Sequence, residues 1–229
     1  MKYISKYSFY ALLATICFAV SSCIVKGSDE PYEETTKSLS PDSFTRIHLS
    51  GVDDITFTQG DSTTVVLTGD KKKIESYSIE TDNGCLTIKS TKKINISKHP
   101  VHIHITSPSV EEISINGAGN FCLKDMLKTE KLDLSLGGAG SLNIEKIECG
   151  DLKVKVGGAG DVDLDAVTAQ HVSLSMSGVG NVKAVFVNSG DAEVSFEGVG
   201  DVTLSGNVKS LNKNSSGTGN INTKNLKIE

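Results

Sequence analysis

Gly138-Ala139-Gly140-Ser141 is one of six Gly-x-Gly turns that recur through the second half of this 229-residue chain. The other five are Gly117-Ala118-Gly119-Asn120, Gly158-Ala159-Gly160-Asp161, Gly178-Val179-Gly180-Asn181, Gly198-Val199-Gly200-Asp201 and Gly217-Thr218-Gly219-Asn220. The second glycines of successive copies lie 21, 20, 20, 20 and 19 residues apart. A fixed period in this range is typical of a solenoid, in which each repeat buries its apolar face against its neighbours. The period therefore predicts a repeat architecture.

The repeat between Gly140 and Gly160 contains three short groups in which apolar and polar residues alternate. The apolar members of the groups are Leu142 and Ile144, then Ile147 and Cys149, then Leu152, Val154 and Val156. Alternation predicts half-buried strands, and the change of parity between groups indicates that the chain turns a corner without leaving the core. Two such corners and the Gly-x-Gly corner predict a three-sided turn of about 20 residues.

Equivalent positions of successive repeats are expected to stack as inward columns. The columns are Leu142, Val162, Val182 and Val202; Ile144, Leu164, Ala184 and Leu204; Ile147, Val167 and Val187; Val154, Leu174 and Val194; and Val156, Met176 and Phe196. Stacking places equivalent strands in parallel at roughly 4.8 Å spacing, and parallel connections are overwhelmingly right-handed. We therefore predict an all-β fold, a right-handed parallel β-helix (β-solenoid).

The glycines of the repeating corner are expected to allow a positive φ or a close approach of two backbones, which only Gly tolerates at low cost. The residue that follows is usually Asn or Asp, whose short side chain can bond nearby backbone groups. We interpret this row as structural turn residues that stack into a ladder along the solenoid. A ligand-binding stripe is the alternative.

The first 22 residues have the pattern of a secretory signal peptide. Lys2 and Lys6 precede an apolar stretch over residues 9–20, which is too short to span a membrane. Val20-Ser21-Ser22-Cys23 resembles the lipobox of bacterial lipoproteins, which implies that Cys23 carries lipid such as palmitate and becomes the new N-terminus. An ordinary signal peptide with an incidental cysteine is the alternative.

Residues 23–42 are polar and acidic and predict a flexible tether between the lipid and the fold. The acidic stretch that begins at Asp29 also resembles signals that send some Bacteroidetes lipoproteins to the cell exterior. We therefore expect a protein lipid-anchored in the outer membrane, and leave open whether it faces the cell surface or the periplasm.

A single β-helical domain is expected over residues 43–229. Residues 43–116 are strand-rich without the 20-residue period, and predict irregular first turns and a cap that covers the end of the solenoid. Asn83-Gly84 predicts a hairpin within this region. Regular repeats cover residues 117–222, and residues 223–229 form the C-terminal end. There Lys213 takes the place of Val154, Leu174 and Val194 in its column.

Few residues have the pattern of a chemical site. Cys85, Cys122 and Cys149 are irregularly spaced and do not form a disulfide framework. His102 and His104 are expected on the outer face of one strand, where they could hold a metal ion only with a third ligand that the sequence does not identify. With a formal net charge of −5 and no basic cluster interleaved with aromatics, the chain is not expected to bind nucleic acid. No cofactor, metal or catalytic residue is expected.

An enzyme of the β-helix type that acts on polysaccharides would need paired carboxylates in a groove built from long loops. The turns after residue 116 are nearly uniform. Asp133, Lys153, Ser173 and Glu193 are expected to align outward in one row of mixed, solvated character. The chain has no Trp and 5% aromatic residues, which gives little support to a platform for stacking sugars.

The repeats, together with two further segments, resemble the "putative auto-transporter adhesin" family, known as the head GIN domain. The two segments are Phe44-Thr45-Arg46-Ile47 with Thr58-Gln59-Gly60-Asp61, and the hairpin Asn83-Gly84-Cys85-Leu86-Thr87-Ile88. The resemblance covers about residues 43–222 and implies a β-helical fold and non-catalytic binding. We expect an envelope adhesin that is held on the membrane by its lipid and binds an unidentified protein or glycan. A carbohydrate-active lyase or hydrolase, and an envelope scaffold without external ligand, are the alternatives.

Overall fold

The computed structural model describes residues 33–51, 54–90 and 101–229. The predicted signal peptide, Cys23 and the first part of the predicted tether lie outside these described residues. Within them, no helix is long and apolar enough to cross a membrane. The only helical element of this part is the four-residue α2, Lys71–Ile74, whose N-cap Asp70 accepts hydrogen bonds from the backbone N–H groups of Lys72 and Lys73.

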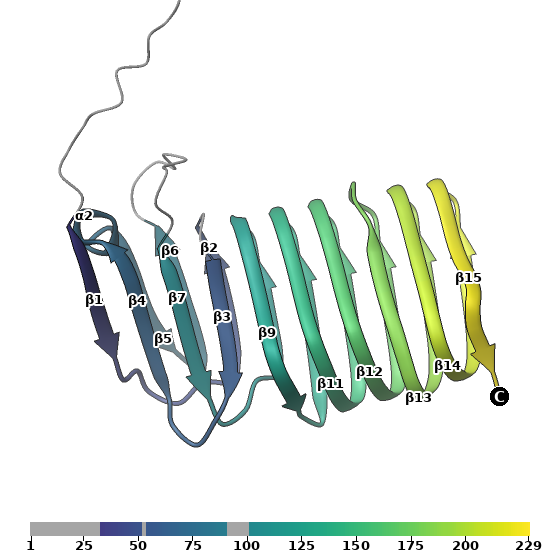
Figure 1. Cartoon of the computed structure of the whole chain (residues 1–229), viewed down its shortest axis with the longest axis horizontal. Helices are drawn as coiled ribbons and strands as arrows, with labels where there is room; N and C mark the ends of the chain where they lie inside the picture. The colour runs from purple at the N-terminus through teal and green to yellow at the C-terminus, as the bar shows by residue number, and fades with distance from the viewer. Residues whose placement is uncertain (1–32, 52–53, 91–100) are drawn as a thin grey trace, which may run out of the picture. The chain divides into compact units, whose positions relative to one another are not determined.

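Long strands that wind around the fold form the regular part of the structure (Figure 1). These strands are β9 (Ala118–Lys128), β11 (Ala139–Val156), β12 (Ala159–Met176), β13 (Val182–Phe196), β14 (Val199–Ser215) and β15 (Thr218–Ile228). Each pairs in parallel with the next along the chain. The shorter strands β8 (Glu112–Ile115) and β10 (Lys131–Leu136) complete the first turns. The fold is the predicted parallel β-solenoid, with about six turns of about 20 residues each.

The strand register confirms four of the five predicted inward columns. Val154 is opposite Leu174, and Leu174 is opposite Val194, and all three side chains are 1% exposed. The third column is wrong at Val187, which is 42% exposed, whereas Phe186 is 1% exposed and pairs with Val167. The register of β13 against β12 shifts around this position, so the chain reaches its corner one residue early and the larger Phe186 fills the core.

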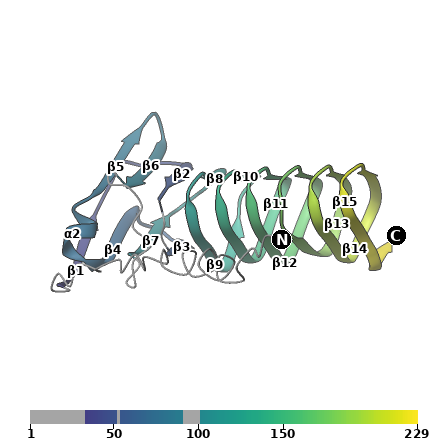
Figure 2. The same cartoon turned by 90° about the horizontal axis from the view of Figure 1, so that it is seen from above.

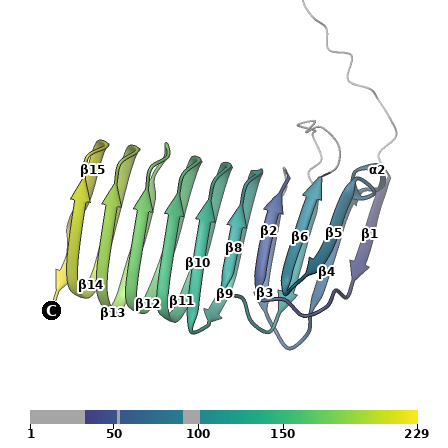
Figure 3. The same cartoon turned by 180° about the vertical axis from the view of Figure 1, so that it is seen from behind.

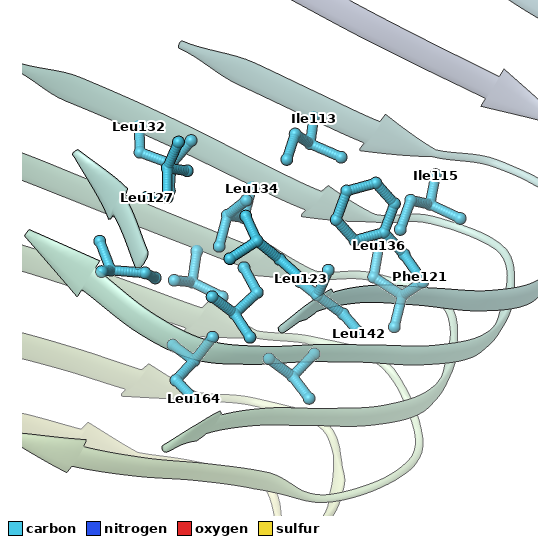
Figure 4. Close-up of a cluster of buried hydrophobic side chains, with 14 of the residues drawn as sticks. Ile113, Ile115, Phe121, Leu123, Leu127, Leu132, Leu134, Leu136, Leu142 and Leu164 are labelled. Atoms are coloured by element: carbon cyan, nitrogen blue, oxygen red, sulfur yellow. The ribbon is translucent and has the colours of Figure 1, made fainter. Parts of the chain in front are cut away.

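The core runs through the solenoid as a continuous stack of aliphatic and aromatic side chains. Figure 4 shows Phe121, Leu123, Leu136 and Leu142 converging from neighbouring strands, and each is at most 1% exposed. Burying a side chain of this size stabilises the fold by about 1.5–3 kcal/mol. Because every turn adds several such residues, neighbouring turns hold one another in a fixed register.

The glycines of the repeating corner are required by the close approach of successive turns. A Cβ atom at Gly160 would lie 1.8 Å from the carbonyl oxygen of Gly140, and one at Gly140 would lie 1.9 Å from that of Gly119. Some of these residues, such as Gly200 with φ +136°, also have a backbone conformation that favours glycine. The corner therefore excludes any side chain at these positions.

The N-terminal end continues two faces of the solenoid, and each face ends in antiparallel strands (Figures 2 and 3). On one face the order is β9, β3 (Asp54–Gln59), β7 (His102–Ser107), β4 (Thr64–Asp70) and β1 (Glu34–Leu39); on the other it is β8, β2 (Arg46–Ser50), β6 (Cys85–Ser90) and β5 (Tyr77–Asp82). β1, β4 and β5 pair antiparallel with their neighbours. The predicted hairpin is confirmed, because β5 and β6 are joined by Asn83 and Gly84 with φ of 48° and 72°.

Part of the predicted tether is strand, so the prediction of a flexible segment over residues 23–42 is wrong for β1. Glu34 is opposite Asp70 and Leu39 is opposite Val65 along the outer edge of β4. Glu33 adds a backbone hydrogen bond and an ion pair of 3.2 Å to Lys71. Acidic composition suggested a solvated chain, but backbone pairing along an unused strand edge needs few apolar side chains.

The C-terminal end has no comparable layer among the described residues. β15 pairs with β14 on one side and with no described strand on the other. Residues of this last turn that occupy core columns are partly or fully exposed, including Ile221, Leu226 and Ile228. Lys213 pairs with Val194 at the end of its column, as predicted, and its side chain is exposed.

Candidate functional site

Two adjoining hollows lie on the outer surface of β10–β14 and together form what we call the groove. One has a volume of about 530 Å³ and the other about 650 Å³, and His171 and Asp191 line both. The first hollow is lined by side chains of β10 and of the later parts of β11, β12, β13 and β14. The second continues around the neighbouring corner, past Cys149 and Lys209.

Two outward columns provide the polar side chains of the first hollow. The first column is Lys131, Asp151, His171, Asp191 and Ser210, and the second, the groove row, is Asp133, Lys153, Ser173, Glu193 and Asn212. Strict parallel register keeps each column in line, one residue per turn at roughly 4.8 Å spacing. The predicted alignment of Asp133, Lys153, Ser173 and Glu193 is thereby confirmed.

Most of the groove row has no partner within the described part of the chain. The side chains of Lys153, Ser173, Glu193 and Asn212 make no hydrogen bond or ion pair there, and all four are exposed. Asp133 differs, since Oδ2 lies 3.0 Å from Lys131 Nζ while Oδ1 is shielded and unpartnered among the described residues. The row thus presents unused donors and acceptors on a rigid sheet.

The ladder at the Gly-x-Gly corner is the opposite case. Asn181 donates to Asp161 Oδ1 from its backbone nitrogen at 2.8 Å and from Nδ2 at 3.1 Å. The backbone nitrogen of Asp201 donates to Asn181 Oδ1, and that of Asn220 donates to Asp201 Oδ1. The predicted structural ladder is confirmed here, because its polar groups are used to hold consecutive turns together.

The first column of the groove contains short-range contacts that fix its carboxylates. Ser210 Oγ donates to Asp191 Oδ1 at 2.7 Å, and His171 Nδ1 lies 3.8 Å from Asp191 Oδ2. The hydrogen bond and charge of Asp133 raise the pKa of Lys131 above its ordinary value. The hollow therefore holds charges of both signs, with the carboxylates of Asp133, Asp151, Asp191 and Glu193 outnumbering the ammonium groups of Lys131 and Lys153.

The arrangement of Ser210, Asp191 and His171 differs from that of a hydrolytic triad. Asp191 lies between the hydroxyl and the imidazole, so His171 has no contact through which to take a proton from Ser210. Burial, reinforced by the charge of Asp151, raises the pKa of Cys149 to about 11, so this thiol is protonated at neutral pH. Neither the hydroxyl of Ser210 nor the thiol of Cys149 is therefore activated as a nucleophile by these contacts.

Apart from Cys149, which lines the second hollow, the other residues that the sequence marks as candidates lie away from the groove. His102 and His104 are exposed on β7, as expected, where His102 Nδ1 is 3.8 Å from Asp54 Oδ2 and His104 Nε2 is 3.4 Å from Thr106 Oγ1. No group of three or more His, Cys, Asp or Glu that could hold a metal ion occurs within residues 33–51, 54–90 and 101–229. Cys85, Cys122 and Cys149 are half-buried and unpaired.

The sequence analysis missed the first column of the groove. His171 and Asp191 carry no motif, and their neighbours in the column differ in charge. The repeat nevertheless contained the signal, because they lie two residues before Ser173 and Glu193 and so face outward on the same strands. Applying the 20-residue period to every outward position would have identified both columns.

The chain was compared with protein families and with known proteins. A family model described as "Putative auto-transporter adhesin, head GIN domain" matches residues 43–168 and 157–229. No curated protein matches the chain.

Three solved structures with a similar fold come from Bacteroides and Parabacteroides species. A "putative adhesin" from Bacteroides fragilis is 23% identical with a TM-score of 0.66, covering 82% of this chain and 95% of its own. One from Parabacteroides distasonis is 20% identical with a TM-score of 0.50, covering 82% and 97%. A "putative lipid binding protein" from the same species is 14% identical with a TM-score of 0.51, covering 85% and 96%. At these identities the likeness concerns the fold.

Proposed function

The chain belongs to the "putative auto-transporter adhesin, head GIN domain" family, and from this premise we propose that it is a non-catalytic binding module of the cell envelope. In this proposal Cys23 carries the lipid anchor, and the groove side of the solenoid contacts an external ligand. Family membership supports a location at the cell surface or in the envelope. The lipobox-like Val20-Ser21-Ser22-Cys23 supports anchoring in the outer membrane.

The observation that carries the proposal is the unused hydrogen-bonding capacity of the groove row. Lys153, Ser173 and Glu193 stand on three consecutive turns beside a hollow and bond to no described residue. Exposed polar groups on a rigid scaffold can bind a ligand at low ordering cost. The ladder at the Gly-x-Gly corner lies on the same turns, but its polar groups already form hydrogen bonds between those turns.

Adhesion by cells that carry the full-length protein would test the proposal. Lys153→Ala/Ser173→Ala/Glu193→Ala is expected to abolish attachment to a panel of immobilised glycans and matrix proteins while surface abundance stays normal. Asp163→Ala/Thr203→Ala is the matched control, since both residues face outward on another side of the same solenoid. Attachment that survives the triple substitution would contradict a role for the groove.

A polysaccharide-degradation assay on the same cells distinguishes binding from catalysis. Binding should depend on several outward residues, each with a modest contribution, and no polysaccharide should be cleaved. Reproducible cleavage that a single groove substitution abolishes would overturn the proposal in favour of a β-helical enzyme.

The lipid anchor has its own test. Cys23→Ala should release the protein from the membrane fraction and prevent labelling with a radioactive fatty acid, because the acylated cysteine would be the attachment point. Cys85→Ala is the control and should leave both unchanged. If the wild-type protein stays in the membrane without taking up label, the assignment of Cys23 is wrong.

A further inference from the structure

The groove has features that narrow the chemistry of its ligand, and this inference rests on the proposed function of the same surface. Carboxylates of Asp133, Asp151, Asp191 and Glu193 lie among the ammonium groups of Lys131 and Lys153. Carboxylates predominate in this lining, so a polyanion is disfavoured, and a polycation is repelled by Lys131 and Lys153 at the β10–β11 end, so it gains from only part of the groove. Mixed charge of this kind favours a ligand without net charge.

A protein segment is a poor match for this surface. The backbone under the groove is already paired on both sides in β10, β11, β12 and β13. An extended peptide could therefore add as a further strand only at the edge of β14 beyond Val208, and not along the groove. The exposed large apolar residues of the described chain are Met126, Val179, Val187, Val199 and Ile228, and none of them lines the first hollow. Protein interfaces depend on apolar or aromatic anchors at their centre, which this surface lacks.

The two outward columns of the groove place hydrogen-bonding side chains at the spacing of the turns. Along the groove row, Lys153 donates, Ser173 donates or accepts, and Glu193 accepts. Asn212 follows with an amide that does both. Beside this row Asp191 is held in place by Ser210 at 2.7 Å. From Lys131 to Ser210 the first column of the groove spans five turns, about 19 Å at the usual strand spacing.

We propose that the groove binds a linear, uncharged oligosaccharide that lies along the solenoid axis. Each sugar ring carries hydroxyl groups that donate and accept, so consecutive rings can bond to consecutive turns. The short side chain of Ser173 leaves room at the centre, between Lys153 on the preceding turn and Glu193 on the following turn. With no aromatic ring to stack on, each ring contributes little and affinity grows with the number of rings.

The test uses the full-length lipoprotein purified in detergent and a series of neutral β-linked glucose, mannose and xylose oligomers from disaccharide to octasaccharide. Saturation-transfer NMR and calorimetry should show affinity for at least one series that rises with length and levels off once the ligand spans the five turns. Ser173→Tyr, which fills the centre, should weaken binding at least about tenfold. Lys153→Ala/Glu193→Ala should do the same, and Asp163→Ala/Thr203→Ala should have no effect.

Two outcomes would overturn the oligosaccharide assignment while leaving a binding role intact. One is binding of a charged polymer such as polygalacturonate that disappears with added salt. The other is groove-dependent attachment of cells to a matrix protein, with no neutral oligomer binding or competing. If neutral oligomers bind equally well to the wild type and to both groove variants, with folding verified by circular dichroism, the site itself is wrong. If instead none of the groove variants changes the attachment of cells, the proposed function itself is overturned.

Discussion

The Gly-x-Gly corner and the groove are built from the same five turns, yet they use polar residues in opposite ways. At the corner, Asp161, Asn181 and Asp201 bond to one another's side chains and backbone. In the groove, Lys153, Ser173 and Glu193 occupy the same turns and bond to no described residue. The contrast shows that a periodic polar row on a solenoid can either bond the turns to one another or leave its side chains free for a ligand. Hydrogen-bond partners, more than residue types, distinguish the two kinds of row.

Leu174→Asp should have the largest effect, because it reaches the core directly beneath the groove. The side chain is 1% exposed between Val154 and Val194. An unpaired carboxylate there should lower the free energy of unfolding by about 4 kcal/mol or prevent folding. Chemical denaturation measures this value, and Ser173→Asp, one residue away and outward, should change it by less than about 0.5 kcal/mol. Equal losses at the two positions would contradict the register.

Gly160→Ala should rank second and tests the corner. The new Cβ would lie 1.8 Å from the carbonyl oxygen of Gly140, so two turns would have to separate. We expect a loss of about 3 kcal/mol in unfolding free energy and a lower midpoint in thermal melts. The matched change in the groove, Ser173→Ala, should be near neutral. If Gly160→Ala is neutral as well, glycine at this corner is not required by close approach.

Asn181→Ala against Asn212→Ala compares the two polar rows directly. Asn181 donates to Asp161 and accepts from the backbone of Asp201, so its loss should cost about 1–2 kcal/mol. Asn212 has no partner among the described residues, and its loss should leave the stability unchanged while weakening ligand binding. Similar free energies of unfolding for the two variants would contradict the conclusion that the corner ladder stabilises the fold and the groove row does not.

The smallest effect concerns Cys149 at the edge of the groove. Burial raises the pKa of its thiol from the ordinary 9.0 to about 11. Since the folded state holds this proton more tightly than the unfolded state, the associated stability is present below pH 9 and is lost as the pH rises toward 11. Alkylation by iodoacetamide at pH 8 should therefore be slower at Cys149 than in the unfolded chain. Peptide mapping by mass spectrometry gives both rates, and equal rates would contradict a protected thiol.

The fold was predictable from sequence because one period of 20 residues repeats the same local pattern. Val154, Leu174 and Val194 were placed correctly since alternation and period agree there. Val187 was misplaced because a shift within β13 does not disturb the spacing of the glycines, and only packing shows that Phe186 fills the core. The strand β1 was missed because it is held by backbone pairing to β4, which leaves little trace in residue type.

The site was less predictable than the fold. The sequence aligned Lys153, Ser173 and Glu193, but it could not show that these side chains are free while those of the corner ladder are bonded. That difference depends on the direction of individual side chains and on the hollow beside them. The same 20-residue period would have placed His171 and Asp191 on the outer surface, but they belong to no motif that marks them as site residues.

Lys213 gives the stack of turns a boundary. A parallel solenoid made of interchangeable turns has no preferred length, because each new turn repeats the contacts of the last. At Lys213 the next layer would have to bury an ammonium group in line with Val154, Leu174 and Val194, at a high desolvation cost. One charged side chain at the end of the apolar column thus disfavours a further turn stacked on this side of the solenoid.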